Sequence, residues 1–230
     1  MLIAFNKTIS YALRREHDQK VEKNVAKILD ALYKENGLDI ERNTTDVEAQ
    51  KRGIDIVMTK EDGSKMKIDE KSASTYFHKH LGTFAFELSS KNNRRGMGWF
   101  DPKNTYIETE AYMLAYPYAK GREELDPLET VDEMEALLIR KSVIWEYLHQ
   151  NGIDSVEKAK ELLNEKGIIT TKYNKRVTSC EDGIPAKRIY TVNDNIRIVE
   201  SFYLEECPIN IVVSRDVLRS LADKVLFKKY

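Results

Sequence analysis

The sequence predicts a mixed α/β or α+β protein in which a helix precedes a sheet of several strands. Apolar residues recur at helical spacing early in the chain, and apolar and polar residues alternate in segments that follow. Gly and Asp-Gly turn signals separate these segments. With 230 residues, 41% of them hydrophobic and 33% charged, the chain is long enough to bury a sizeable core beneath a strongly charged surface.

Residues 1–120 carry the clearest signals of secondary structure. A helix is expected over 17–37, ended by Gly37, because its apolar residues share one face: Val21, Val25, Ile28, Leu29, Leu32. Asp62-Gly63 is turn chemistry that would join two neighbouring strands into a hairpin. Apolar, aromatic and β-branched content predicts strands over five segments: 38–44, 53–59, 65–72, 83–90, 105–119.

The second half of the chain predicts further helices and strands. One helix is expected over 132–152, where the apolar residues share a helical face: Met134, Leu137, Leu138, Ile144, Trp145, Leu148. Asp154 and Glu157 have the spacing of a capping box for a second helix that ends at Gly167. A hairpin over 168–192, two strands and a helix capped by Ser214 over 214–227 complete the chain.

These segments suggest an organisation in three parts. Residues 1–120 would form the core, and 121–195 an inserted helical and hairpin module for substrate placement or for the contacts of a homodimer. Residues 196–230 would return to the main sheet, because the strand over 208–214 is too apolar to stand alone.

Charge and cysteine content exclude several classes of protein. Lys and Arg number 37 and Asp and Glu 38, so a nucleic-acid partner would need a local basic patch or metal ions. Two cysteines are too few for a disulfide framework, and no signal peptide or membrane-spanning stretch is evident. A cytoplasmic location is expected. No phosphate-binding Gly-Lys-Ser/Thr loop and no Gly-x-Ser-x-Gly elbow is present.

The hairpin over 53–72 contains the candidate site. Side chains alternate along a strand, so Asp69 and Lys71 are expected on one face and Met66 and Ile68 on the other. Pairing with the preceding strand would bring Asp55 within reach of Asp69.

Carboxylate and carbonyl oxygens are hard ligands, so Asp55, Asp69 and the backbone carbonyl of Glu70 would suit Mg²⁺ or Mn²⁺. Such a metal lowers the pKa of a bound water, and Lys71 could orient or deprotonate the water that attacks. Phosphodiester hydrolysis is the reaction that most naturally needs this set. The alternative interpretation of the same residues is a solvated hairpin in which carboxylates pair with lysines.

The segments "GID", with Asp55, and "DEK", residues 69–71, resemble the motifs of the PD-(D/E)XK nuclease superfamily. The resemblance covers roughly residues 15–120 and implies a restriction-endonuclease-like fold, a mixed central sheet flanked by helices. It also implies a metal-dependent deoxyribonuclease, with DNA as partner and Mg²⁺ or Mn²⁺ as cofactor. Ile54 stands where the family motif names proline, and Asp69 where Glu is more frequent.

The resemblance assigns roles to these residues. Asp55, Asp69 and Lys71 would be catalytic, and Asp55, Asp69 and the Glu70 carbonyl would hold the metal. Relatives also place a glutamate on the first helix, and Glu22 is the match here, with Asp18 as the second choice.

Residues around the site could contact the nucleic acid. The candidates for phosphate contacts are basic or polar residues near the site: Gln50, Lys91, Arg94, Arg95. Trp99 would either stack on a base or pin its loop by burial, and Glu87 would either extend the acidic cluster or pair with a lysine. The alternative function is a non-catalytic nucleic-acid-binding or assembly protein with a degenerate nuclease fold.

Overall fold

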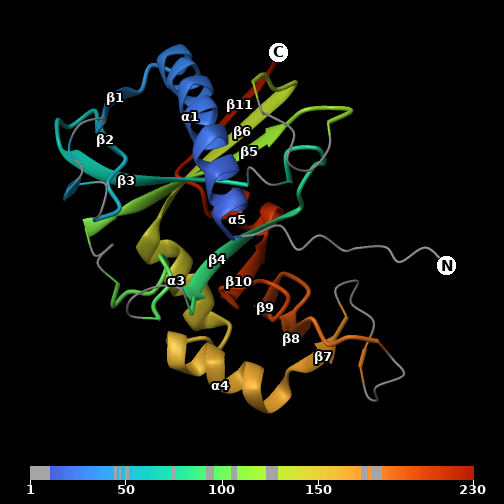
Figure 1. Ribbon diagram of the computed structural model, residues 1–230. Helices are drawn as coiled ribbons and strands as arrows, with labels where there is room; N and C mark the ends of the chain where they lie inside the picture. Colours follow the sequence, from blue (N-terminus) through green and yellow to red (C-terminus); the bar gives the residue numbers. More distant parts are fainter. Residues whose placement is uncertain are drawn as a thin grey trace.

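Figure 1 shows the chain as a computed structural model with four helices and two sheets in its described part. For residues 11–19 the structure describes only the backbone. The described residues are 11–43, 46, 48–49, 52–73, 76–91, 96–104, 108–122, 129–171, 176–177 and 183–230. The protein is a mixed α+β protein, as the sequence predicts.

A six-stranded sheet, curled into a half-barrel, contains the candidate hairpin. In spatial order its strands are β1 (Asp39–Arg42), β2 (Ile56–Thr59), β3 (Lys65–Ser72), β5 (Ala111–Tyr118), β6 (Glu133–Arg140) and β11 (Lys224–Lys229). Each neighbouring pair is antiparallel except β3 and β5, which run parallel. Gly63 turns the β2–β3 hairpin with φ of 79°, a conformation that glycine adopts without strain, which confirms the predicted Asp62-Gly63 turn.

Helix α1 (Tyr11–Glu35) lies across one face of this sheet (Figure 1). Its apolar stripe packs on side chains of β2, β3 and β5 that point to the same face, with Val25 and Leu29 in one buried cluster with Ile68. The predicted helix is confirmed, although it begins earlier than residue 17. The face of the sheet that carries Met66 and Ile68 is thus the face under α1.

A five-stranded antiparallel sheet packs on the opposite face. Its strands, in spatial order, are β4 (Thr83–Ser89), β10 (Ile209–Ser214), β9 (Ile196–Ser201), β8 (Lys187–Asn193) and β7 (Ile168–Thr170). Phe84 and Phe86 of β4 form a second buried cluster with Tyr112 and Leu114 of β5. The remaining helices are α3 (Lys141–Gln150), α4 (Val156–Lys166) and α5 (Arg215–Leu221).

The expectation of one helix over 132–152 is wrong for its first half. Residues 133–140 form β6, which lies between β5 and the edge strand β11 of the six-stranded sheet, and the helix begins only at Lys141. Apolar residues of β6 are buried on both faces, and its residues 136–139 form a continuous apolar run. Periodicity alone cannot distinguish such a strand from a buried helix.

Two further expectations need correction. The final helix ends at Leu221, and β11 follows it, because 224–229 pairs with β6 along its whole length. Helix α4 is capped by Ser155, whose hydroxyl accepts a hydrogen bond from the Lys158 backbone N–H at 3.0 Å, and not by Asp154.

The expected hairpin over 168–192 is present as the antiparallel pair β7–β8. Its expected bend at residues 182–183 falls largely outside the described residues. Strand β6, within 121–195, joins the six-stranded sheet, whereas β9 and β10, within 196–230, join β4 in the second sheet.

Among the described residues, no helix combines the length and the apolar character needed to cross a membrane.

Candidate active site

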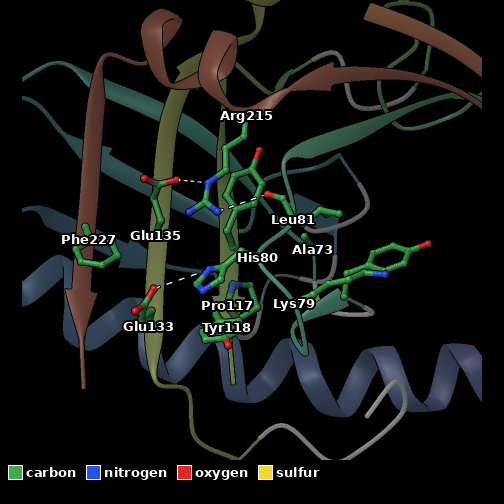
Figure 2. Close-up of a pocket in the computed structure, with 12 residues that line it drawn as sticks. Ala73, Lys79, His80, Leu81, Pro117, Tyr118, Glu133, Glu135, Arg215 and Phe227 are labelled. Carbon is green, nitrogen blue, oxygen red and sulfur yellow. Dashed lines mark hydrogen bonds and ion pairs between the residues drawn. The ribbon is translucent and has the colours of Figure 1, made fainter. Parts of the chain in front are cut away.

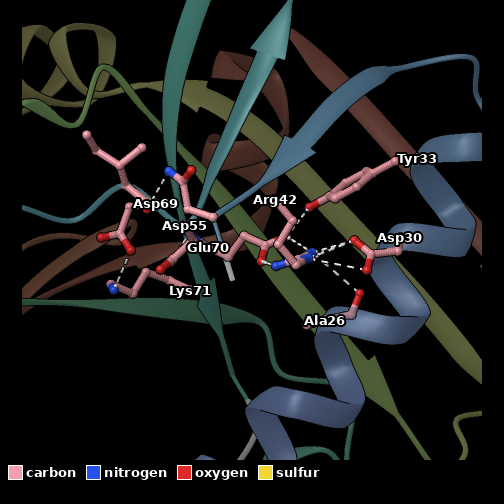
Figure 3. A network of polar contacts seen from close by, with 10 residues as sticks. Ala26, Asp30, Tyr33, Arg42, Asp55, Asp69, Glu70 and Lys71 are labelled. Carbon is pink, nitrogen blue, oxygen red and sulfur yellow. Dashed lines mark hydrogen bonds and ion pairs between the residues drawn. The ribbon is translucent and has the colours of Figure 1, made fainter. Parts of the chain in front are cut away.

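Asp55 and Asp69 lie opposite each other at the end of the β2–β3 pair. Ile56 pairs with Ile68, and the Asp55 backbone N–H donates to the Ile68 carbonyl at 3.0 Å. The Asp55 carboxylate accepts a hydrogen bond from the Glu70 backbone N–H at 2.9 Å (Figure 3). Strand pairing therefore brings the two carboxylates together, as the sequence predicts.

Asp69 is almost completely buried, with 1% of its surface exposed. One carboxylate oxygen, Oδ1, accepts from Lys71 Nζ at 2.7 Å, whereas buried Oδ2 has no hydrogen-bond partner among the described residues. Burial raises the pKa of Asp69 to about 8; the Lys71 ammonium opposes this rise and the neighbouring Asp55 carboxylate adds to it. At neutral pH the Asp69 carboxyl group is thus largely protonated, and it ionises near pH 8.

Lys71 stands beside Asp69 and beneath an aromatic ring. Its ammonium lies 5.2 Å from the centre of the Trp99 ring, within the range of a cation–π contact. Trp99 is partly buried and packs against Phe86 and Tyr112, with ring centres 5.8 and 5.3 Å away. Trp99 therefore pins its loop and also covers the lysine.

The loop over 96–104 is held against β4 by a close backbone approach at Gly98. The Gly98 N–H donates to the Leu88 carbonyl at 2.9 Å, and the Phe100 N–H donates to the Glu87 carbonyl at 3.0 Å. A Cβ at Gly98 would lie 2.1 Å from the Glu87 carbonyl oxygen, so only glycine fits there. This contact sets the distance between the Trp99 ring and the Lys71 ammonium.

Glu87 points its half-buried side chain into the same region. Burial and, to a smaller extent, the charge of Glu206 raise its pKa to about 7, while Lys71 acts to lower it. The influence of Lys71 agrees with the idea that Glu87 lies near the site. However, the described residues contain no group of three or more His, Cys, Asp or Glu side chains that could hold a metal ion.

Lys141 and Asp101 belong to the site although the sequence did not single them out. Lys141 is the first residue of α3, and its backbone N–H donates to the Glu110 carbonyl at 2.8 Å. Partial burial lowers the pKa of Lys141, and the nearby charges of Asp69 and Asp101 raise it. Asp101 is itself 5% exposed, so Lys141 has two buried acidic neighbours.

The Glu70 side chain points to the other face of β3, toward α1 (Figure 3). Its Oε1 accepts from the Tyr33 hydroxyl at 2.6 Å and from Arg42 Nη2 at 3.0 Å, and its Oε2 pairs with Arg42 Nη1. Arg42 in turn contacts Asp30 of α1 at 2.6 Å. Glu70 thus clamps β3 to β1 and α1, which leaves only its backbone carbonyl for the site.

The other predicted site residues either lie away from Asp69 and Lys71 or fall outside the described residues. Glu22 is an exposed residue of α1, the helix that covers the face opposite to Asp69 and Lys71. The side chain of Asp18 lies outside the described residues, as do three of the nucleic-acid candidates: Gln50, Arg94, Arg95. Lys91 is exposed, and its backbone N–H donates to the Glu206 carbonyl at 2.8 Å.

A small pocket lies farther along the same face of the sheet, between Ala73, residues 76–81, β5, β6 and Arg215 (Figure 2). Arg215 pairs there with buried Glu135 at 2.5 Å and lies 4.4 Å from the centre of the Tyr116 ring. His80 stacks on Tyr118 with ring centres 3.7 Å apart. The side chains that line this pocket do not include Asp55, Asp69 or Lys71.

Comparisons with known proteins identify no relative: no protein-family model, no curated protein and no solved structure matches this chain. The function must therefore be argued from the site itself.

Proposed function

We propose that this protein is a metal-dependent nuclease that hydrolyses the phosphodiester bonds of DNA through a PD-(D/E)XK-type site. The observation that carries the proposal is the convergence of three side chains at one end of the β2–β3 pair. Asp55 and Asp69 face each other across β2 and β3, and Lys71 donates to Asp69 at 2.7 Å. In a solvated hairpin Asp69 would be exposed, whereas only 1% of its surface is exposed here. This burial argues against interpreting these residues as a merely solvated hairpin.

The order of the elements around the site supports a restriction-endonuclease-like core. Helix α1 precedes an antiparallel β1–β2–β3 meander, and β5 then adds parallel to β3. Between β3 and β5 the described residues contain β4 and the loop over 96–104 but no α-helix, so the chain departs here from a core that includes a further helix. On the order of the other elements we propose this fold family for the first half of the chain, with the second sheet as an addition to it.

The donor set fits one Mg²⁺ or Mn²⁺ ion. These cations commonly use one or two carboxylates and keep several waters, so Asp55 and Asp69 suffice even without a third acidic side chain. The buried Oδ2 of Asp69 lacks a hydrogen-bond partner among the described residues, which is expected of an oxygen atom that coordinates a cation when the metal is bound. The Glu70 carbonyl lies on the Asp55 side of β3, because the N–H and C=O of one strand residue point the same way.

Each group of the chain has a distinct role in the proposed reaction. When bound, the metal lowers the pKa of a water and offsets negative charge on the phosphate. Lys71 orients the attacking water and donates to the charge that builds on the phosphate oxygens. Trp99 limits the access of bulk water to Lys71. The lower local dielectric constant strengthens the interaction between Lys71 and the phosphate oxygens. Lys91 is exposed just after the end of β4, where it can contact a neighbouring phosphate of the nucleic acid.

A cleavage panel tests this proposal. Linear, circular, single-stranded and branched DNA, and RNA, are incubated with the protein and Mg²⁺ or Mn²⁺. We expect cleavage of at least one DNA substrate, which Asp69→Ala and Lys71→Ala abolish and EDTA prevents. Asp62→Ala, in the exposed hairpin turn, is the matched control and should cleave like the wild type.

A metal titration by calorimetry separates the site from its substrate. The wild type should bind Mn²⁺ and Asp55→Ala should not. If the wild type binds no metal and cleaves no nucleic acid, the nuclease proposal is wrong, and the non-catalytic alternative takes its place.

A further inference from the structure

We propose that Lys141 is a second cationic residue of this site and binds a non-bridging oxygen of the scissile phosphodiester beside Asp69. The proposal rests on the nuclease function and extends it to a residue outside the "GID" and "DEK" segments. It assigns the phosphate to a position between Lys71, which comes from β3, and Lys141, which comes from α3.

The pairing of the strands places Lys141 within reach of Asp69. Ile68 pairs with Ala111, and Ala111 pairs with Arg140, so the end of β6 lies two strands from the centre of β3. Two strand spacings amount to about 10 Å, a gap that an extended lysine and an aspartate side chain can bridge. The hydrogen bond from the Lys141 backbone to Glu110 at 2.8 Å fixes the start of α3 at this point.

The packing of α3 directs the side chain of Lys141 toward the site. Lys141 and Trp145 are four residues apart and therefore share one face of the helix. Trp145 stacks on Phe100, with ring centres 4.8 Å apart and planes 5° from parallel. Phe100 precedes Asp101 in the loop over 96–104, so this face of α3 packs on the loop that holds both Trp99 and Asp101.

The position of Lys141 is unfavourable for the helix itself. A positive side chain in the first turn faces the positive end of the helix dipole. The preceding residue, Arg140, makes no side-chain capping bond, and its own charge is paired with Asp223 at 3.0 Å. Asp69 and Asp101 compensate locally, but an uncharged residue would have avoided the conflict. Such a locally unfavourable charge is expected where function requires it.

The charges of the site become complementary to a phosphodiester only when Lys141 is counted. With Glu87 in its neutral form, Asp55, Asp69 and Asp101 supply three negative charges when ionised, and Lys71 and Lys141 supply two positive ones. A divalent cation then leaves one net positive charge, which matches the single negative charge of the phosphodiester. Without Lys141 the loaded site would be neutral and would attract the phosphate less strongly.

The test compares Lys141→Gln, which removes the charge, with Lys141→Arg, which keeps it. Cleavage rates are measured on the best substrate of the panel, per folded molecule as determined by circular dichroism, from 50 to 300 mM NaCl. We expect kcat/KM to fall about 10- to 100-fold in K141Q, as for the loss of one charge-assisted hydrogen bond. The slope of log kcat/KM against log salt should also become shallower by about 0.9, since one phosphate contact is lost.

K141R should stay within about threefold of the wild type and keep its salt slope, because the charge is retained. Lys65→Gln is the control: Lys65 belongs to the far end of β3, its side chain is 63% exposed, and it should behave like the wild type. If K141Q matches the wild type, or if both Lys141 variants lose activity without a change in slope, the role of Lys141 is wrong while the nuclease function stands. A wild type that cleaves nothing overturns both proposals.

Discussion

Replacing Asp69 with Asn should stabilise the protein at alkaline pH but not at acidic pH. Asn keeps the shape of the side chain, can accept from Lys71 through Oδ1, and can donate through its amide to the Asp55 carboxylate. The substitution removes only the charge that Asp69 acquires when it ionises in its buried position.

The direction follows from the proton that Asp69 holds. The folded protein keeps this proton up to about pH 8, whereas the unfolded chain loses it near the ordinary value of 3.8. Between these values the folded state binds more protons, so the free energy of unfolding of the wild type falls as pH rises. The contribution is fully present below about pH 4 and is lost by about pH 8.

The magnitude is set by the interval between the two pKa values. At about 1.4 kcal/mol for each of roughly four pH units, the ceiling is about 6 kcal/mol. Relaxation around a buried ion reduces its effective cost to several kcal/mol, so we expect Asp69→Asn to gain about 2–4 kcal/mol at pH 9. At pH 5 the gain should shrink to at most about 1.6 kcal/mol, because only the unfolded chain has then released the proton, and it should vanish below about pH 4, where Asp69 is protonated in both states.

Urea unfolding between pH 5 and pH 9, in EDTA, measures this difference. Asp62→Asn is the control, because hydrogen bonds from Ser64 lower the pKa of exposed Asp62 and keep it ionised throughout this range. Its stability should therefore follow the pH dependence of the wild type. If the free energies of unfolding of Asp69→Asn and the wild type change with pH in parallel, the raised pKa that we assign to buried Asp69 is refuted.

Three further substitutions test the supports of the site by urea unfolding. Gly98→Ala should cost at least about 1–3 kcal/mol, because its methyl group would overlap the Glu87 carbonyl, and tryptophan fluorescence should shift as the loop moves; an unchanged midpoint would show that the loop is not tightly held. Glu70→Gln should cost about 1–3 kcal/mol by weakening the bidentate pair with Arg42, and a neutral result would mean that the pair is not a clamp. Glu135→Gln should cost about 3 kcal/mol, since two arginines lose their buried partner; equal stability would contradict that assignment.

Local patterns predict the hairpin and the placement of Asp55, Asp69 and Lys71 well. Alternation of apolar and polar residues fixes which side chains of β3 share a face, and the turn at Gly63 fixes the pairing with β2. Together these two features bring Asp55 and Asp69 together before any distant contact is considered. The site residues of this hairpin could therefore be anticipated.

Features that depend on distant contacts could not be anticipated. The strand β4 was recognisable, but nothing local indicates that it pairs with β10 in a second sheet, some 120 residues later in the chain. Strand β6 is buried on both faces, so its apolar run matches a helix as well as a strand. That error concealed Lys141, because its position at the start of a helix becomes visible only when β6 is recognised as a strand.

The alternation along β3 also restricts how this protein could change length during evolution. Insertions in the turn over 60–64 would leave both strands in place and should be tolerated. A single residue inserted between Met66 and Asp69 would reverse the faces of everything that follows it. Glu70 would enter the site, while Asp69 and Lys71 would turn toward α1 and Arg42. Natural variants of this chain should therefore vary in the length of this turn and keep the spacing within β3.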